Sequence, residues 1–184
     1  SITTEQGLSQ NYINCIYQDH YGYIWIGTVV GLNKFDGLDF KIYKSDSEST
    51  DSISNSDIQC IYETSDGSLW IGTENGLDRF NRAENTFTVY KYSSEDANSL
   101  SGSSIQALYE DSRGILWVGT TAGLNSYDPK TGTFTRYLSN AYSISSDDIT
   151  SLCVDSNDIL WIGTSSGLNS YNSETGVFTT FCYD

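Results

Sequence analysis

The five-residue sequence Leu69-Trp70-Ile71-Gly72-Thr73 occurs four times in the chain with only conservative changes. The other copies are Ile24-Trp25-Ile26-Gly27-Thr28, Leu116-Trp117-Val118-Gly119-Thr120 and Leu160-Trp161-Ile162-Gly163-Thr164. Successive tryptophans are 45, 47 and 44 residues apart. Self-similarity at such a period indicates an array of structural units, either a propeller or a solenoid. The chain is therefore predicted to contain four copies of one unit.

Each copy lies within a longer pattern of four predicted strands. In the second copy, an apolar strand from Ile58 to Tyr62 precedes the tryptophan, Gly76-Leu77 follows it, and a last strand runs from Phe87 to Tyr92. Glycine at the hairpin corner allows the positive φ that tight turns require. Each unit is thus predicted to be a sheet of four antiparallel strands. Within one propeller region, 1–184, we place the units approximately at residues 8–52, 53–99, 100–143 and 144–184.

Both faces of the predicted sheet are apolar. In a strand, Trp70 and Gly72 face one side and Leu69 and Ile71 face the other. One small sheet cannot cover two apolar faces alone, whereas similar sheets stacked around an axis cover each other. The predicted fold is therefore all-β, a β-propeller of four repeats of four antiparallel strands. A solenoid is the alternative, but its repeats usually hold one strand or a helix pair.

The charge of the chain limits its partners. The 184 residues include 24 acidic and 9 basic ones, which gives a net charge of -15. This field repels phosphate backbones and anionic lipids, so we expect neither nucleic acid nor a membrane surface as a partner. The sequence has no apolar run long enough to span a membrane, and its first residues, Ser1 to Gln10, lack the features of a signal peptide.

The four cysteines, Cys15, Cys60, Cys153 and Cys182, form no CxxC pair and have no accompanying histidines. This argues against a zinc site or a redox motif. Cys15, Cys60 and Cys153 lie within apolar strand patterns, where we expect small buried thiols rather than disulfides. Because no calcium-binding pattern occurs either, no metal and no cofactor is assigned.

A family resemblance follows from the order of these motifs. Tyr-x-Asp, Gly-x-Leu-Trp-Ile-Gly-Thr, Gly-Leu-Asn and Phe-Thr-x-Tyr together resemble the two-component regulator propeller repeat over nearly the whole chain. The opening stretch, Thr3 to Ser9, is similar to the entry of the first such repeat in the sensor regions of hybrid two-component histidine kinases. The resemblance implies a periplasmic input module, the extracytoplasmic part of an inner-membrane protein of a gut-type bacterium, which recognises glycan fragments and signals through the membrane.

Four blades are fewer than the seven-bladed ring that is common in the family. The chain is therefore expected to be a partial ring, continued by further blades of a parent chain, or half of an eight-bladed ring closed by a homodimer. An arc of four blades has two terminal apolar faces that something must cover. A closed four-bladed ring is the competing outcome.

The candidate ligand site lies in the loops that precede the first strand of each unit. These loops are long and polar, and in a propeller of this strand order they share a rim with the turns between the second and third strands. The short polar side chains just before the opening isoleucine could hydrogen-bond sugar hydroxyls. They are Asn11, Tyr12, Ser56, Asp57, Ser103, Ser104, Asp147 and Asp148. Solvated loops without a ligand are the alternative.

A serine four residues before each opening isoleucine is expected to close a turn by bonding to local backbone. These serines are Ser9, Ser54, Ser101 and Ser145.

Catalysis is not expected. His20 is the single histidine, lies in a turn that we place at the surface, and has no neighbouring residues that could form a triad. The arginines fall at unrelated repeat positions, so no cluster for a substrate carboxylate is predicted. They are Arg79, Arg82, Arg113 and Arg136.

Single carboxylates, such as Glu63, Glu74 and Glu110, stay open as acid or base groups. The predicted function is a ligand-sensing propeller module for an oligosaccharide. The alternative is a structural or protein-interaction propeller without a small-molecule ligand.

Overall fold

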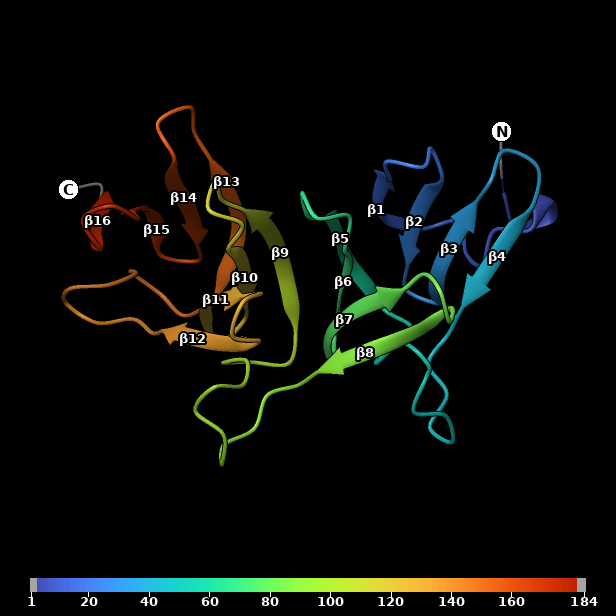
Figure 1. Ribbon diagram of the computed structural model, residues 1–184, viewed down its shortest axis with the longest axis horizontal. Helices are drawn as coiled ribbons and strands as arrows, with labels where there is room; N and C mark the ends of the chain where they lie inside the picture. Colours follow the sequence, from blue (N-terminus) through green and yellow to red (C-terminus); the bar gives the residue numbers. More distant parts are fainter. Residues whose placement is uncertain (1–2, 182–184) are drawn as a thin grey trace. The chain divides into compact units, whose positions relative to one another are not determined.

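The computed structural model describes residues 3–181 (Figure 1). Within this range the regular structure is almost entirely β. The single described helix is the 3-10 turn η1 (Thr4–Gln6), which Thr3 caps by accepting a hydrogen bond from the backbone N–H of Glu5. No helix in the described range is long and apolar enough to cross a membrane. The predicted all-β fold class is confirmed.

The described strands form four sheets, each of four antiparallel strands that pair in chain order. We call these sheets blades 1 to 4. Blade 1 contains β1 (Ile13–Gln18), β2 (Ile24–Thr28), β3 (Gly31–Phe35) and β4 (Phe40–Tyr43). Blade 2 contains β5 (Ile58–Glu63), β6 (Leu69–Thr73), β7 (Gly76–Asn81) and β8 (Thr86–Tyr90). Blade 3 contains β9 (Ile105–Glu110), β10 (Leu116–Thr120), β11 (Gly123–Asp128) and β12 (Thr133–Tyr137). Blade 4 contains β13 (Ile149–Val154), β14 (Ile159–Thr164), β15 (Gly167–Asn172) and β16 (Val177–Phe181).

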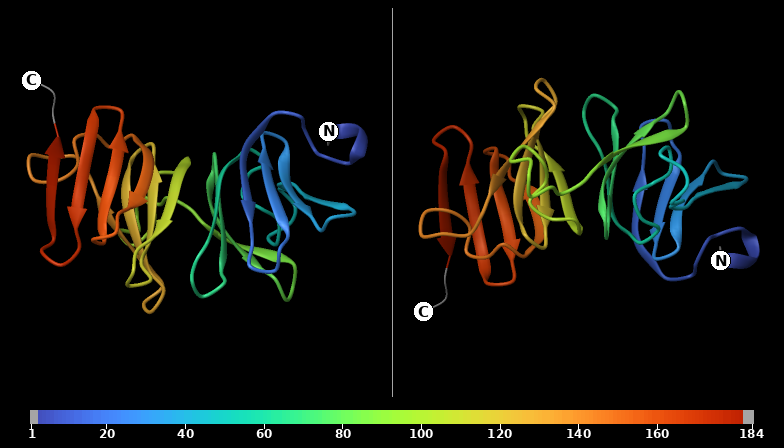
Figure 2. Two further views of the ribbon diagram at one scale, coloured as in Figure 1. Left: turned by 90° about the horizontal axis from the view of Figure 1, so that it is seen from above. Right: turned by 90° about the horizontal axis from the view of Figure 1, so that it is seen from below.

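The chain folds as two compact units, Ser1–Tyr90 and Lys91–Asp184, which we call unit 1 and unit 2. Each unit contains two blades stacked face to face (Figure 2). In unit 1, β5 of the second blade contacts β1 and β2 of the first, and in unit 2, β13 contacts β9 and β10. The first strands of neighbouring blades therefore lie nearest each other, as in a propeller whose innermost strands surround an axis.

Glycine is required at two positions of the repeat for different structural reasons. Gly31 and Gly76, at the start of β3 and β7, have φ of 153° and 145°, which confirms the predicted hairpin corner. Gly27, in the repeated five-residue sequence, has no such φ. A Cβ built on it would lie 2.7 Å from Cγ2 of Ile58, the opening isoleucine of the next blade. The absence of a side chain thus lets neighbouring blades approach.

An aromatic quartet fills the space between the two blades of each unit. In unit 1, the ring of Trp25 lies 5.9 Å from Tyr43 of its own blade and 5.1 Å from Phe80 of the next, and Phe87 completes the group 5.2 Å from Phe80. Unit 2 repeats the arrangement. Its members are Trp117, Tyr137, Tyr171 and Phe178. Because Trp25 and Trp117 are almost fully buried, these quartets form the centre of the cores.

The aspartate six residues before the tryptophan anchors the turn between the first two strands. Asp19 Oδ2 accepts a hydrogen bond from the indole Nε1 of Trp25 at 2.8 Å, and Asp19 Oδ1 accepts from the backbone N–H groups of Tyr21 and Tyr23. Buried indole N–H groups need such a partner. The same indole bond recurs in blades 3 and 4, from Trp117 to Asp111 and from Trp161 to Asp155.

The recurrent serines have a structural role, but the prediction that they bond to local backbone was wrong. Ser9 Oγ lies 2.9 Å from Thr28 Oγ1 and accepts a hydrogen bond from Asn33 Nδ2 at 2.8 Å. These partners are 19 and 24 residues away, on β2 and β3. The serine therefore ties the incoming loop to the end of its blade, where a threonine hydroxyl and a buried amide need partners. The other blades repeat the serine–threonine contact.

The expectation of buried thiols fails at one position. No disulfide joins Cys15, Cys60 and Cys153 to one another, and Cys153 is exposed on β13. Cys15 and Cys60 are partly buried, and burial raises the pKa of the Cys15 thiol to about 12. Neither is therefore a thiolate at neutral pH, because burial raises the pKa of Cys60 as well. Cys182 lies outside the described residues.

Candidate functional site

The loops before the first strands lie against the turns between the second and third strands. The backbone N–H of Glu74 donates to the carbonyl oxygen of Asp57 at 3.1 Å. Thr121 donates in the same way to Ser104, and Ser165 to Asp148, at 3.2 and 3.0 Å. In blades 2 to 4, the residue that precedes the opening isoleucine is therefore held at one rim together with the turn between the second and third strands.

Several of the predicted site residues bond within their own loops. Asn11 Oδ1 accepts a hydrogen bond from the Thr4 N–H at 3.0 Å, and the Ser56 hydroxyl accepts from the Ser45 N–H at 3.0 Å. Asp147 Oδ1 accepts from the Ser139 N–H at 2.6 Å. These side chains hold the loops in place, which leaves them less free to contact a ligand.

The other predicted residues differ in what surrounds them. Tyr12 is 69% exposed. Ser104 accepts a hydrogen bond from Gln106 Nε2 at 2.7 Å, and Ser103 beside it is partly buried. The backbone N–H of Asp148, which is also partly buried, donates a hydrogen bond to the Ser146 hydroxyl at 3.2 Å.

Asp57 is the predicted residue around which other polar side chains converge. Its Oδ1 accepts hydrogen bonds from Gln59 Nε2 at 3.0 Å and from Asn14 Nδ2 at 3.3 Å. Gln59 Nε2 also donates to Glu74 Oε1 at 3.2 Å, so one amide links two carboxylates. Asn14 belongs to β1 of the neighbouring blade and also donates to the Ile58 carbonyl at 2.8 Å. We call Asn14, Asp57, Gln59 and Glu74 the rim cluster.

The rim cluster combines groups that suit hydroxyl recognition. Burial raises the pKa of Asp57, and the nearby charge of Glu74 raises it further, against the opposing hydrogen bond from Asn14. Carboxylate oxygens accept and amide groups both donate and accept, which is the pattern that vicinal hydroxyls require. Within residues 3–181, no three His, Cys, Asp or Glu side chains are grouped closely enough to hold a metal ion.

The opposite end of unit 1 holds an ionic network. This end contains the turns that join the first strand of each blade to the second and the third strand to the fourth. Arg82 donates from its two terminal nitrogens to Asp19 Oδ2 at 2.8 Å and to Glu63 Oε1 at 2.6 Å. His20 Nδ1 lies 2.7 Å from the same Glu63 oxygen. His20 is exposed, as predicted, yet its backbone N–H also donates to Glu63 at 2.8 Å. The network joins blades 1 and 2.

Hydrogen bonds dominate the titration of Asp19 in this network. Burial opposes ionisation, but the bonds from the Trp25 indole and the Arg82 guanidinium outweigh it and lower the pKa of Asp19. Asp19 is therefore ionised at neutral pH and balances the charge of Arg82.

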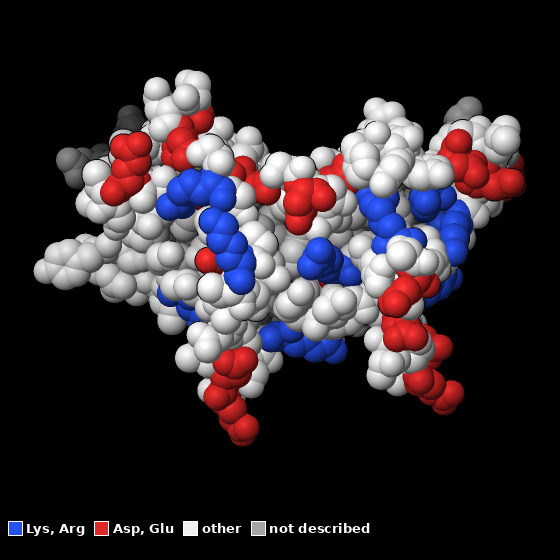
Figure 3. Space-filling model, viewed as in Figure 1, with Lys and Arg blue, Asp and Glu red and all other residues white. Residues whose placement is uncertain are grey.

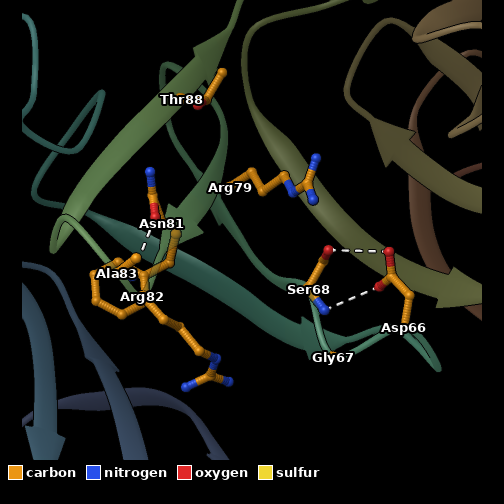
Figure 4. A pocket seen from close by; sticks show the side chains of 9 residues that line it. Asp66, Gly67, Ser68, Arg79, Asn81, Arg82, Ala83 and Thr88 are labelled. Carbon is orange, nitrogen blue, oxygen red and sulfur yellow. Dashed lines mark hydrogen bonds between the residues drawn. The ribbon is translucent and has the colours of Figure 1, made fainter.

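Three cavities open at this end of unit 1. The largest, of about 460 Å³, lies on blade 2, where Asp66, Ser68, Arg79, Asn81, Arg82 and Thr88 line it (Figure 4). Asp66 accepts hydrogen bonds from the N–H and the hydroxyl of Ser68, and the guanidinium of Arg82 lies away from that of Arg79 (Figure 4).

The other two cavities adjoin, since Tyr23 and Lys34 line both. One has a volume of about 260 Å³ and is lined by Tyr21, Tyr23, Lys34, Phe80, Arg82 and Asn85. Its neighbour has about 190 Å³ and extends along Asp36, Asp39, Phe40 and Lys41. Sequence reasoning missed this end of the unit because Arg82 and Asn85, which line the first of these cavities, have no identical counterparts in the other repeats.

A family model described as "Two component regulator propeller" matches four segments of the chain. The segments are residues 7–29, 52–75, 99–122 and 143–166. Together they cover about half of the chain, and each contains one of the repeated tryptophan sequences.

Solved structures with the same fold include extracellular domains of two component systems from B. thetaiotaomicron. The extracellular domain of the hybrid two component system BT3049 is 30% identical with a TM-score of 0.72, and the match covers 97% of this chain and 31% of that domain. The extracellular domain of the hybrid two component system BT4673 is 23% identical with a TM-score of 0.80, over 98% of this chain and 26% of that domain. Virginiamycin B lyase from Staphylococcus aureus, 14% identical with a TM-score of 0.69 over 94% of this chain and 56% of that chain, shares the fold alone.

A curated relative gives a shorter but closer match. The protein "Histidine kinase P4" of Formosa agariphila is 52% identical over 54 residues, which is 29% of this chain and 4% of that protein. The chain thus spans about a third or less of the extracellular domains that it resembles, and its match covers a small part of the kinase.

Proposed function

Because the chain belongs to the two component regulator propeller family, we propose that it is a saccharide-binding part of the sensor region of a two-component signalling protein. The similar domains BT3049 and BT4673 are extracellular domains of such systems, which supports a position outside the inner membrane, in the periplasm. Their greater length supports further blades in a parent chain. A second copy that completes a ring is the other arrangement proposed.

The rim cluster carries the proposal of a saccharide ligand. Two carboxylates and two carboxamides meet there within hydrogen-bond distance, and one of the carboxylates, Asp57, has a raised pKa. Neutral saccharides are bound through such acceptors and donors, which align with their hydroxyl groups. The equivalent positions of Asp57 and Glu74 in blade 3 are Ser104 and Thr121, which lack this acceptor density.

A ligand at the rim cluster could act on the contact between two blades. Asn14 of blade 1 donates to both Asp57 and the Ile58 carbonyl of blade 2. A sugar hydroxyl that donates to Asp57 competes with the longer of these two bonds. Binding would therefore shift the contact between blades 1 and 2, which is the two-state element that a sensor needs.

The experiment uses the 184-residue chain and a panel of oligosaccharides, with calorimetry on each ligand that raises the thermal midpoint. We expect one saccharide class to bind, and the isosteric change Asp57→Asn to weaken it by about tenfold or more, as loss of a charge-assisted hydrogen bond implies. Asp148→Asn in blade 4 is the matched control and should bind normally. Equal affinity of all three chains, or no binding by any saccharide, would contradict the proposal.

We also propose that the chain binds its ligand without converting it. The described histidine and three of the four arginines are engaged in structural contacts: His20 and Arg82 with Glu63, Arg113 with Asp111, and Arg136 with backbone carbonyls. Release of reducing ends from a bound saccharide, abolished by Glu74→Gln, would show catalysis instead.

A protein-interaction role is the second candidate, and the acidic loops favour it. The loop between β4 and β5 carries Asp46, Glu48 and Asp51, which are exposed. Acidic side chains stand out at the edge of this face of the molecule (Figure 3). Such a loop suits a basic protein partner. Replacing these three residues by asparagine and glutamine should leave saccharide binding unchanged if the rim cluster is the site.

A further inference from the structure

We propose that unit 1 has a second ligand site at the end opposite the rim cluster, which binds the carboxylate of a uronic acid. The site, the turn-side groove, consists of the two adjoining cavities that share Tyr23 and Lys34. It rests on the proposed function only in taking the ligand to be a sugar. The affinity for a carboxylate is argued from the groove itself.

Lys34 is the first observation. Across residues 3–181, its ammonium has no carboxylate within ion-pair distance and no hydrogen-bond acceptor. It lies instead over the ring of Tyr23, 3.6 Å from the centroid, and 5.6 Å from that of Trp25. An ammonium carries three N–H donors, and a partly buried one without an acceptor is ready for an anionic ligand. Burial lowers the pKa of Lys34, although Asp19 opposes this.

Arg82, which lines the same cavity, is the second observation. Its two terminal nitrogens are held by Asp19 and Glu63, but its Nε is buried without a hydrogen-bond partner in the described part of the chain. The two carboxylates fix the guanidinium in place, so a ligand does not have to order it on binding. Because the Nε of Arg82 is buried and its terminal nitrogens are paired, Arg82 forms a fixed part of the cavity wall, and the charged donors left for a ligand are those of Lys34.

Asn85 gives the cavity a neutral donor. Its Oδ1 accepts hydrogen bonds from Lys41 Nζ at 2.7 Å and from the Tyr43 hydroxyl at 2.8 Å. The acceptor is therefore saturated, and its NH₂ group is left to donate to a ligand oxygen. Asn85 adopts a positive φ of 59°, which asparagine tolerates better than most residues, and it lines the cavity.

The walls and the far end of the groove suit a sugar ring. Tyr21 is 63% exposed and, with Tyr23 and Phe80, gives the cavity an aromatic lining. At about 260 Å³ the cavity is smaller than the range of about 300–1,000 Å³ of drug-sized sites, so it fits a single ring. The adjoining cavity has carboxylates at Asp36 and Asp39, which accept hydroxyl donors and repel a second anion.

The charge distribution allows an anion at this groove. In a chain of net charge -15, Lys and Arg side chains gather over β3 and β4 of unit 1 (Figure 3). Lys34 and Lys41 belong to these strands, and Arg82 lines the first cavity together with Lys34. A uronic acid has its carboxylate at one end and hydroxyls around the rest of its ring. It therefore matches a groove in which cations line both cavities and carboxylates line only the second.

Calorimetric titration of the full chain with glucuronate tests the site, with glucose as the neutral counterpart. We expect glucuronate to bind, glucose to bind at least about tenfold more weakly, and added salt to weaken glucuronate binding. Lys34→Gln should lower the affinity for glucuronate by about tenfold or more. The control Lys130→Gln, which removes an exposed lysine of unit 2, should leave it unchanged.

Two further variants distinguish binding at the turn-side groove from binding at the rim cluster. Lys34→Arg keeps the charge and should retain more affinity than Lys34→Gln, whereas Asp57→Asn, at the rim cluster, should not affect glucuronate. Loss of glucuronate binding in Asp57→Asn would place the acid at the rim cluster and overturn the second site. Equal affinity for glucose and glucuronate, or preference for an acidic peptide over glucuronate, would also overturn it.

Discussion

The two units build the same core and differ at the turns beside it. Trp25, Tyr43 and Phe80 of unit 1 have their equivalents in Trp117, Tyr137 and Tyr171 of unit 2. At the turns, unit 1 joins its blades by the network of Arg82 with Asp19 and Glu63. Unit 2 instead uses hydrogen bonds from Ser112 to Asp158, and its Arg113 pairs with Asp111 of its own blade.

This comparison teaches that the repeat has two classes of position. Core positions recur because every blade must pack on a neighbour, so they determine the fold. Turn positions do not have to pack on a neighbouring blade, and in unit 1 they carry the ionic network, the turn-side groove and the carboxylates of the rim cluster. We therefore expect the functional residues at positions where the repeats differ in sequence.

The largest expected effect tests whether the two cores are equivalent. Trp25→Ala and Trp117→Ala should each cost about 3 to 5 kcal/mol in the free energy of unfolding, because both leave a cavity between blades. Trp161→Ala should cost less, since Trp161 is only partly buried. Urea denaturation followed by circular dichroism measures the three midpoints. A Trp161 variant as unstable as the other two would show that blade stacking is not the source of the loss.

A smaller effect is expected at the glycine between blades. Gly119→Ala should destabilise by about 1 to 3 kcal/mol, because its Cβ would lie 2.6 Å from Ile149 Cγ2 of the next blade. Gly163→Ala is the matched control, because its Cβ meets the Ser151 hydroxyl, which can rotate away. The same denaturation experiment compares them. If the control lost as much stability, the glycine would be needed for its backbone and not for blade approach.

These results bear on how much the sequence predicts. The strands, the glycine corners and the all-β fold followed from residues that recur in every repeat. The bond between Asp19 and Trp25 also recurs, so the six-residue spacing could have revealed it. The ionic network gave no signal, because Arg82 and His20 have no counterparts in the other repeats and the partners lie 19 to 63 residues apart. The prediction that Cys153 is buried was wrong because an apolar strand pattern does not show whether a neighbouring blade covers that face of the strand.

The smallest expected effect concerns the ionic network of unit 1. Arg82→Met should destabilise by about 1 to 2 kcal/mol at pH 7, less than for a buried pair because Arg82 is partly exposed. The pKa of Asp19 is lowered in the folded state, so its ionised form stabilises the fold above about pH 4. This contribution is lost as the pH falls from there through the folded pKa.

Denaturation as a function of pH tests this contribution. The Arg82→Met chain should lose less stability between pH 5 and 3 than the unchanged chain does, because Asp19 then lacks the arginine that helps to lower its pKa. Parallel slopes for the unchanged and Arg82→Met chains would show that Asp19 does not depend on this arginine.

The central claim, that unit 1 and not unit 2 holds the saccharide site, is tested most directly by amide NMR spectra of the full chain during titration with the saccharide that binds. We predict that the signals of Asp57 and Glu74 shift with ligand concentration, whereas those of Asp148 and Ser165, at the same repeat positions in blade 4, stay in place. Shifts at Asp148 and Ser165 as large as those at Asp57 and Glu74 would contradict the account, because binding would then follow the repeat itself.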